Sequence, residues 1–349
     1  MVFHLLCLAI TFLDVFVHVL NKVIRKPSFV AYIIPAFVLL ISSVCSCKKS
    51  ALELSFLSIP SGTQHHLYNI QLFNKDTLYV CGGNEGKGIV LRSVDGGITW
   101  ETLNANFTRT LRSICFLSST KGFAGADSAF VYRTDDGGKT WNEHIDYTGV
   151  PYQYRKSLHN VIFTDSLNGY FAGGNDFGRG IIYYTHDGGN KWNTFGLEHE
   201  LRGVASGLNG ICAVGYGAVL LSDNGTDFQL LRSDNAYYTG LVLPTSNAGW
   251  ACSYNGGLYA TTNGGKSFNN VKKENHAVSS REHFLCIDVK NNRVIASGHS
   301  GVTSLSSDGG ATFKTGYSLN ETRINAVKLL PSNKTICVGS NGKIFLADY

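Results

Sequence analysis

Side chains suited to binding an anion recur along this chain, spaced by a repeat of about 40 residues. When the repeats are aligned, Arg112, His159 and Arg202 fall at one equivalent position, near the start of a predicted strand. His283 and Arg323 lie two residues before that position in later repeats. Arginine and histidine donate hydrogen bonds and carry positive charge, so this pattern predicts a cationic surface suited to a carboxylate or an acidic peptide. The equivalent positions hold Tyr68, Arg112, His159, Arg202, Thr239, Leu285 and Asn325.

Three long connections are expected to extend this surface. One runs from Asn142 to Ser157, and the other two are the glycine-rich segments Gly82–Gly88 and Gly173–Gly180. Loops rich in tyrosine and arginine on a rigid scaffold are frequent binding surfaces. The alternative is that these arginines are only solvated and that the tyrosines pack loops against the sheets. The residues added to the candidate binding set are Tyr152, Tyr154, Arg155 and Arg179.

A short phrase, Ser/Thr-x-Asp-x-Gly-x-Thr-aromatic, occurs six times between Tyr79 and the C-terminus, most clearly at Ser93–Trp100 and Thr134–Trp141. An aspartate accepts hydrogen bonds from amides of its own turn, glycine permits positive φ, and the aromatic ring packs between sheets. We therefore interpret the phrase as structural rather than catalytic or metal-binding. The structural residues expected from it are Asp95, Trp100, Asp136, Trp141, Asp187, Trp192, Asp308 and Phe313.

The segments between these phrases predict short antiparallel strands. Each unit has β-branched and aromatic runs separated by glycine-rich turns, which is typical of a four-stranded meander. The last unit ends at Tyr349 before its fourth strand, whereas Leu52–Ile59 reads as a lone strand before the first unit. Pairing the two would close a ring and cover exposed edges. Residues 52–349 are thus expected to form an all-β, seven-bladed β-propeller of four-stranded blades, closed by the N-terminal strand.

The phrases resemble Asp-box, or bacterial neuraminidase, repeats. Together with the form aliphatic-Gly-x-x-Gly-x-aliphatic at Gly215–Val219, Gly298–Val302 and Gly339–Ile344, they most resemble the photosystem II stability/assembly factor family. The resemblance spans essentially all of residues 52–349. It implies a propeller that binds a partner protein. Relatives of this family also occur as exported propellers in organisms without photosynthesis.

The N-terminal residues 1–47 are expected to be a leader, followed by a short tether at 48–51. An apolar run, Phe29–Val44, follows Lys22, Arg25 and Lys26, as in a secretory signal. Its end resembles a bacterial lipoprotein signal in which Cys47 is acylated. The alternative is a plain membrane-spanning anchor. The earlier apolar stretch, residues 1–20, is interpreted as preceding the true start. We expect an exported protein that a lipid anchors in the bacterial cell envelope.

Charge and composition limit the classes of function. The formal net charge is +5, and it falls to about +3 without the leader, which is too little to indicate nucleic-acid binding. The 11 histidines are scattered, so neither a metal site nor a cofactor is predicted. The favoured function is a non-enzymatic protein-binding or assembly scaffold acting through the face that carries Arg112.

Two alternatives to the scaffold remain. The first is a glycoside hydrolase or sialidase-like enzyme, which requires two carboxylates. Glu200, Glu282, Glu321 and Asp176 are available for that role, but no two of them stand out as a pair. The second is a carbohydrate- or peptide-binding lipoprotein, in which Tyr152, Tyr154, Tyr237 and Tyr238 would stack on sugars.

Overall fold

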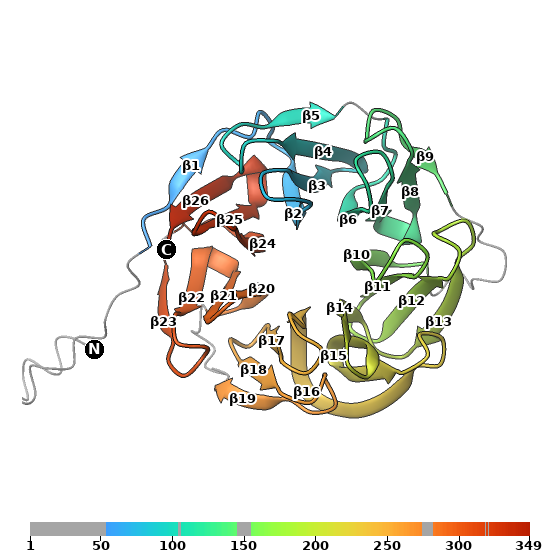
Figure 1. Cartoon of the computed structure of the whole chain (residues 1–349), viewed down its shortest axis with the longest axis vertical. Helices are drawn as coiled ribbons and strands as arrows, with labels where there is room; N and C mark the ends of the chain where they lie inside the picture. Colours follow the sequence, from blue (N-terminus) through green and yellow to red (C-terminus); the bar gives the residue numbers. More distant parts are fainter. Residues whose placement is uncertain (1–53, 104–105, 145–154, 274–281, 318, 320) are drawn as a thin grey trace, which may run out of the picture. The chain divides into compact units, whose positions relative to one another are not determined.

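The computed structural model describes residues 54–349 except 104–105, 145–154, 274–281, 318 and 320. The predicted leader, the tether, Cys47, Tyr152 and Tyr154 lie outside these residues. Leu52–Tyr349 forms one compact unit, in which sheets follow one another in a ring around a central opening (Figure 1). Within the described part, no helix is both long enough and apolar enough to cross a membrane.

Among the described residues, five sheets contain four antiparallel strands each. The first consists of β2 (His66–Leu72), β3 (Leu78–Asn84), β4 (Lys87–Ser93) and β5 (Glu101–Leu103). The second consists of β6 (Leu111–Phe116), β7 (Gly122–Ala126), β8 (Val131–Thr134) and β9 (Asn142–Glu143). The third consists of β10 (Ser157–Phe163), β11 (Gly169–Asn175), β12 (Arg179–Thr185) and β13 (Asn193–Leu197). The fourth consists of β20 (Phe284–Lys290), β21 (Arg293–Gly298), β22 (Val302–Ser306) and β23 (Lys314–Tyr317). The fifth consists of β24 (Ile324–Leu329), β25 (Lys334–Gly339), β26 (Ile344–Asp348) and β1 (Leu57–Ile59).

The remaining sheet has six strands, so the prediction of seven separate four-stranded blades is wrong. The cause is β16 (Gln229–Val242), which continues through a stretch where the sequence predicts a break. Its first part pairs with β15, and its last part, from Tyr238 onward, pairs with β17. Two predicted blades therefore share one strand. The strands of this sheet are β14 (Leu201–Gly207), β15 (Gly210–Ser222), β16, β17 (Gly249–Ser253), β18 (Leu258–Thr261) and β19 (Asn269–Lys272).

The ring is closed by strands from the two ends of the described chain. β1 pairs antiparallel with β26, with Ile59 opposite Ile344. This is the place that the sequence assigns to the N-terminal strand, although the strand is limited to Leu57–Ile59. Its pairing covers the outer edge of β26, where backbone donors and acceptors would otherwise lack partners.

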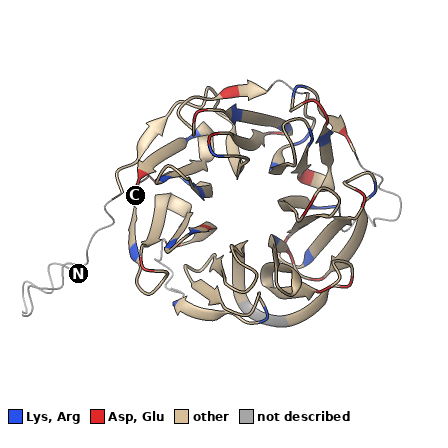
Figure 2. Ribbon diagram, in the orientation of Figure 1, with Lys and Arg blue, Asp and Glu red and all other residues tan. Residues whose placement is uncertain are grey.

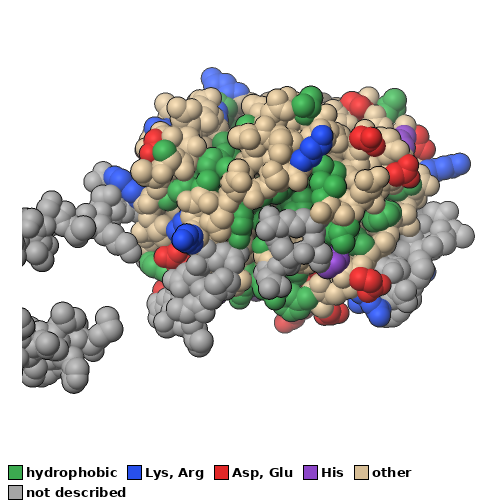
Figure 3. Space-filling model, turned by 90° about the horizontal axis from the view of Figure 1, so that it is seen from below, with side chains coloured by type: hydrophobic (Ala, Val, Ile, Leu, Met, Phe, Trp, Pro, Cys, Tyr) green, Lys and Arg blue, Asp and Glu red, His purple; other side chains and the backbone are tan. Residues whose placement is uncertain are grey.

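The hydrophobic core lies between neighbouring sheets. β3 and β25, each next to the innermost strand of its sheet, are almost wholly buried. Leu67 and Val80 of one sheet pack with Ile336 and Val338 of the next. The outermost strands are much more exposed, as in β9 and β19. Figure 3 shows one side of the ring, where apolar side chains reach the surface in separate places.

The Asp phrase forms the turn that its residue types predict. Asp136 accepts hydrogen bonds from the backbone N–H and the hydroxyl of Thr140, at 2.9 and 2.6 Å. These bonds hold the pKa of the Asp136 carboxyl at about 2. Gly138 has φ +88°, and Trp141 donates its indole N–H to the Gly138 carbonyl at 3.2 Å. Asp95 and Asp308 make the same contacts in their own phrases.

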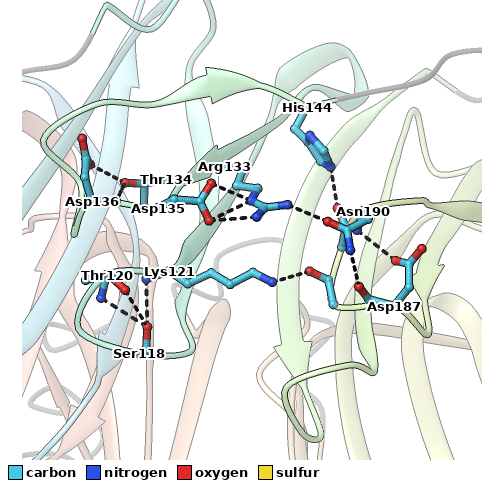
Figure 4. Close-up of polar contacts among 12 residues, drawn as sticks. Ser118, Thr120, Lys121, Arg133, Thr134, Asp135, Asp136, His144, Asp187 and Asn190 are labelled. Carbon is cyan, nitrogen blue, oxygen red and sulfur yellow. Dashed lines mark hydrogen bonds and ion pairs between the residues drawn. The ribbon is translucent and has the colours of Figure 1, made fainter.

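Polar side chains also join neighbouring sheets near these turns. Lys121 Nζ donates to the carbonyl of Gly188 at 2.7 Å. Arg133 Nη1 donates to Asn190 Oδ1 at 2.9 Å. Both bonds run from the second sheet to the Asp phrase of the third (Figure 4). The phrase therefore holds its own turn and also receives bonds from the preceding sheet.

Candidate functional site

A ring of β-bulges surrounds one mouth of the central opening. In β2, Leu67 and Asn69 pair with consecutive residues of β3, so Tyr68 is the extra residue between them. The innermost strand segments of the other sheets have the same irregularity. A bulge bends its strand and redirects a side chain. The bulged residues are Tyr68, Arg112, His159, Arg202, Thr239, Leu285 and Asn325, which is the set of equivalent positions that the sequence predicts.

Glycine on the neighbouring strand allows these bulges. A Cβ at Gly215 would overlap the carbonyl oxygen of Glu200, two residues before the bulged Arg202. Gly298 and Gly339 would make equivalent overlaps with His283 and Arg323. The first glycine of the repeated Gly-x-x-Gly form is thus required by a close approach of two backbones.

All seven bulged residues line one cavity of about 640 Å³. Arg323 lines it as well, so Tyr68, Arg112, His159, Arg202 and Arg323 of the predicted binding set lie together. The other lining residues are Phe177, Tyr216, Tyr237, Tyr254, Asn255 and His299.

Three other residues of the predicted binding set are not part of the lining. His283 lies just behind it, stacked on Tyr254 with ring centroids 4.4 Å apart. Arg155 and Arg179 do not line the cavity, and Arg179 is an exposed residue at the start of β12. The cavity lining therefore covers only part of the face that the sequence predicts for binding.

The cavity is less cationic than the sequence predicts, because two arginines are compensated. Arg112 forms a two-pronged ion pair with Asp127, with N–O distances of 2.6 and 2.9 Å. Arg202 lies 2.6 Å from the carboxylate of Glu200, which is 2% exposed. Arg323 forms no ion pair with any described residue and donates to Asn325 Oδ1 at 3.0 Å. Figure 2 shows positive and negative residues together around the opening.

The histidines of the cavity add no positive charge near neutral pH. Burial, with a further contribution from Arg202, lowers the pKa of His159 to about 4. Burial and the charge of Arg323 likewise lower the pKa of His299 to about 4. His159 Nε2 lies 3.0 Å from the Gly174 carbonyl, which can only accept, so this nitrogen carries the proton. Its other nitrogen faces Arg202 Nη1 at 3.5 Å. His159 is therefore a neutral, hydrogen-bonded wall residue rather than a free base.

Repeat alignment does not single out Phe177, Tyr216 or Tyr254 of the lining, and it does not show the ion pairs of the arginines. Phe177 lies in the β11–β12 hairpin, Tyr216 within β15, and Tyr254 after β17. The sequence contains a signal for Phe177 and Tyr254, because both lie in connections between second and third strands on the face chosen for binding. Glu200 lies two residues before Arg202, at the position that holds His283 and Arg323 in later repeats, but alignment does not show that it pairs with Arg202. Alignment likewise does not show that Asp127 pairs with Arg112.

The lining offers no obvious chemistry for glycoside hydrolysis. Among the described residues, no carboxylate side chain lines the cavity, whereas the reaction requires two flanking the scissile bond. No group of three or more potential metal ligands occurs in the described ranges. Tyr238, a candidate sugar-stacking residue, is fully buried. What the cavity presents is arginine and amide donors beside aromatic rings.

Comparison with known proteins gives one family match, over part of the chain, and several similar solved structures. Residues 97–227 match the family described as photosynthesis system II assembly factor YCF48. No curated protein sequence matches this chain. Among solved structures, the WD40 β-propeller domain of Doa1 has a TM-score of 0.64 at 9% identity, covering 84% of this chain and 97% of that one.

Two structures of YCF48 itself are similar to this chain. YCF48 bound to D1 peptide has a TM-score of 0.65 at 15% identity, covering 86% of this chain and 97% of that one. YCF48 from Cyanidioschyzon merolae has a TM-score of 0.63 at 19% identity, covering 84% and 98%. Together with the family match over residues 97–227, they confirm the resemblance predicted from the repeats: this chain is a BNR-type β-propeller similar to the photosystem II assembly factors.

Proposed function

We propose that this chain is a non-enzymatic assembly scaffold that takes up an acidic peptide segment of a partner protein in its cavity. The observation that carries the proposal is Arg323, whose guanidinium lines the cavity and pairs with no described carboxylate. Burial lowers the pKa of Arg323, so its charged form gains from an anion brought beside it. A cavity of about 640 Å³ holds a few side chains, as peptide and small-ligand sites do.

A similar structure supports the same proposal. A solved YCF48 structure has D1 peptide bound, and this chain shares its fold. At 15% identity the likeness concerns architecture, so the cavity's own residues must decide which peptide binds here. Arginine beside tyrosine and histidine favours a carboxylate-bearing segment over a basic one.

Capture from membranes tests the scaffold. The full chain, its Arg323→Gln variant and its Arg109→Gln variant would be incubated with cross-linked native membranes. Arg109 is the matched control because it stacks over Phe130 outside the cavity lining. We expect a protein bound by wild type and Arg109→Gln but lost by at least about tenfold with Arg323→Gln. Equal recovery by all three would move the interface away from the cavity, and no specific protein would contradict the scaffold.

We also propose that a lipid at Cys47 tethers the propeller to the bacterial cell envelope. The support is the leader sequence, in which a basic segment, an apolar run and Cys45-Ser46-Cys47 follow one another. A Cys47→Ser variant should move the chain from the membrane fraction to the soluble fraction, whereas Cys45→Ser should not. Membrane retention by both variants would favour a spanning anchor instead.

A further inference from the structure

Phe177 is unusual within the cavity because it is both exposed and held in a rare backbone conformation. The residue is 63% exposed, and its φ is +62° after Asp176 at +60°. Bulky L-residues seldom adopt this region, and they remain there only where the surrounding structure holds them. The tight β11–β12 hairpin accounts for the positive φ, but it does not require a bulky ring there. A ring that is 63% exposed adds little to folding, so the residue type at this position indicates a role in binding.

Glu200 holds the hairpin that carries Phe177. The backbone N–H of Phe177 donates to Glu200 Oε2 at 2.9 Å, and the N–H of Glu200 donates to the Phe177 carbonyl at 3.3 Å. The carboxylate is itself fixed by Arg202. Gly174 lies so close that a Cβ there would be 2.8 Å from Glu200 Cα. The absence of a side chain at Gly174 therefore admits the buried glutamate beneath the hairpin, and the glutamate in turn positions the ring.

The ring of Phe177 completes an aromatic wall on one side of the cavity. Its centroid lies 4.8 Å from that of Tyr216 and 6.3 Å from that of Tyr237. Tyr216 and Tyr237 are 5.6 Å apart, and all three residues line the cavity. They come from three elements, the β11–β12 hairpin, β15 and β16. Rings gathered from separate elements form a built apolar surface rather than a chance exposure of one side chain.

Arg323, which pairs with no described carboxylate, lines the same cavity and belongs to a different sheet from the three rings. Arg323 immediately precedes β24, and Figure 1 shows β24 and β15 on different sides of the central opening. A ligand that fills the cavity thus meets a guanidinium and an apolar wall together. Charge complementarity selects a carboxylate for the first, and the aromatic rings select an apolar group for the second.

We propose that Phe177, Tyr216 and Tyr237 form a subsite for an aromatic or bulky aliphatic side chain of the bound peptide, while Arg323 takes a carboxylate of the same peptide. The inference rests on the proposed function, since it states which peptides that site takes. A peptide side chain fits this wall better than a sugar, because the rings meet at 32° to 85° and form a corner rather than one flat face on which a sugar ring could stack.

The variant Phe177→Asn separates this role from a structural one. Asparagine tolerates positive φ, so the variant keeps the N–H that Glu200 accepts and loses only the ring. A structural residue would lower the melting temperature when replaced, whereas we expect an unchanged or higher value. Leu208→Ala is the matched control, because Leu208 is 62% exposed and does not line the cavity.

The probes are pools of short soluble peptides that share one fixed aspartate. A second position is fixed in turn as Phe, Tyr, Trp, Leu, Ala, Ser or Gly, and the others are randomised. Peptides retained by the full chain are quantified by mass spectrometry. We expect wild type and Leu208→Ala to enrich the aromatic and leucine pools about tenfold over the alanine pool. Phe177→Asn should retain acidic peptides without this preference.

Each outcome has a distinct meaning. Acidic peptides that bind through Arg323 with no side-chain preference, or a preference that survives Phe177→Asn, overturn the subsite and leave the proposed function standing. If wild type retains no acidic pool, the proposed function fails and the subsite fails with it. Neutral oligosaccharides retained by wild type and lost with Phe177→Asn, without any peptide binding, would assign the rings to sugar and overturn both.

Discussion

His159 connects the chemistry of the cavity to the stability of the fold. It is enclosed between Glu200 Oε1 at 3.4 Å and the Gly174 carbonyl at 3.0 Å. Burial is the largest cause of its lowered pKa, about 4 against a usual 6.5. In the unfolded chain the imidazole binds a proton below about pH 6.5, but in the folded protein it does so only below about pH 4. The native packing therefore requires the neutral form of His159.

This difference predicts a loss of stability in acid. Between pH 6.5 and 4 the unfolded state binds more protons, so the free energy of unfolding falls as the pH falls through this window. Moving from about pH 7 to about pH 4.5 should cost the wild type roughly 2 kcal/mol more than His159→Gln. Urea unfolding at the two pH values measures this. Parallel losses in both proteins would show that His159 does not titrate as its surroundings imply.

Which residues reach the cavity follows from the repeats, whereas their electrostatics do not. Alignment places Arg112, Arg202 and His159 at the cavity because each repeat bulges at the same position. It cannot show that Asp127 and Glu200 neutralise the two arginines, since the residue types at these positions differ from repeat to repeat and the ion pairs form only in the folded protein. A partner charge several residues away is decided by tertiary contacts, and repeat spacing does not encode them.

The paired inner strands depend on glycine where a bulge brings two backbones together. A methyl group at Gly215 would overlap the Glu200 carbonyl, so Gly215→Ala should lower the free energy of unfolding by about 2–3 kcal/mol. Gly178→Ala is the control, because a Cβ there meets only one atom, 3.7 Å away. Urea unfolding of both variants measures the difference. Wild-type stability in Gly215→Ala would mean that the bulge shifts freely.

The closed ring depends on β1. Residues Leu52–Tyr349 include this strand, whereas a chain beginning at Ser61 would lack it and expose the edge of β26. That chain also loses Leu54 and Ile59, which are 9% and 8% exposed. We expect its melting temperature to fall by roughly 5–10 °C and the chain to associate through the free edge.

Thermal unfolding and light scattering compare the two truncated chains with the full one. The chain that begins at Leu52 serves as the control, because it lacks the leader but keeps β1. It should behave like the full chain. Equal stability and a monomeric state for the chain beginning at Ser61 would show that β26 needs no partner.

Strand alternation and turns predict the five four-stranded sheets, but they predict wrongly at the six-stranded one. The prediction of separate blades requires a break between the fourth and fifth repeats, and Ser233, Asp234 and Asn235 in that stretch are turn-forming types. In the structure the backbone stays extended there, because β15 supplies partners to one part of β16 and β17 to the rest. Whether a chain turns or continues between two sheets depends on those neighbours, and local composition does not record them.

The short strand β1 also has a mechanical consequence. It contains three residues, compared with seven in β2, and it is the described strand nearest to the N-terminus. Tension applied along the chain from its N-terminal side loads the pairing of β1 with β26 before it loads any other described sheet. Force would therefore separate β1 from β26 and open the ring there, while the remaining sheets stayed intact. The pairing of β1 with β26 is thus the mechanically weakest contact of the described ring under such tension.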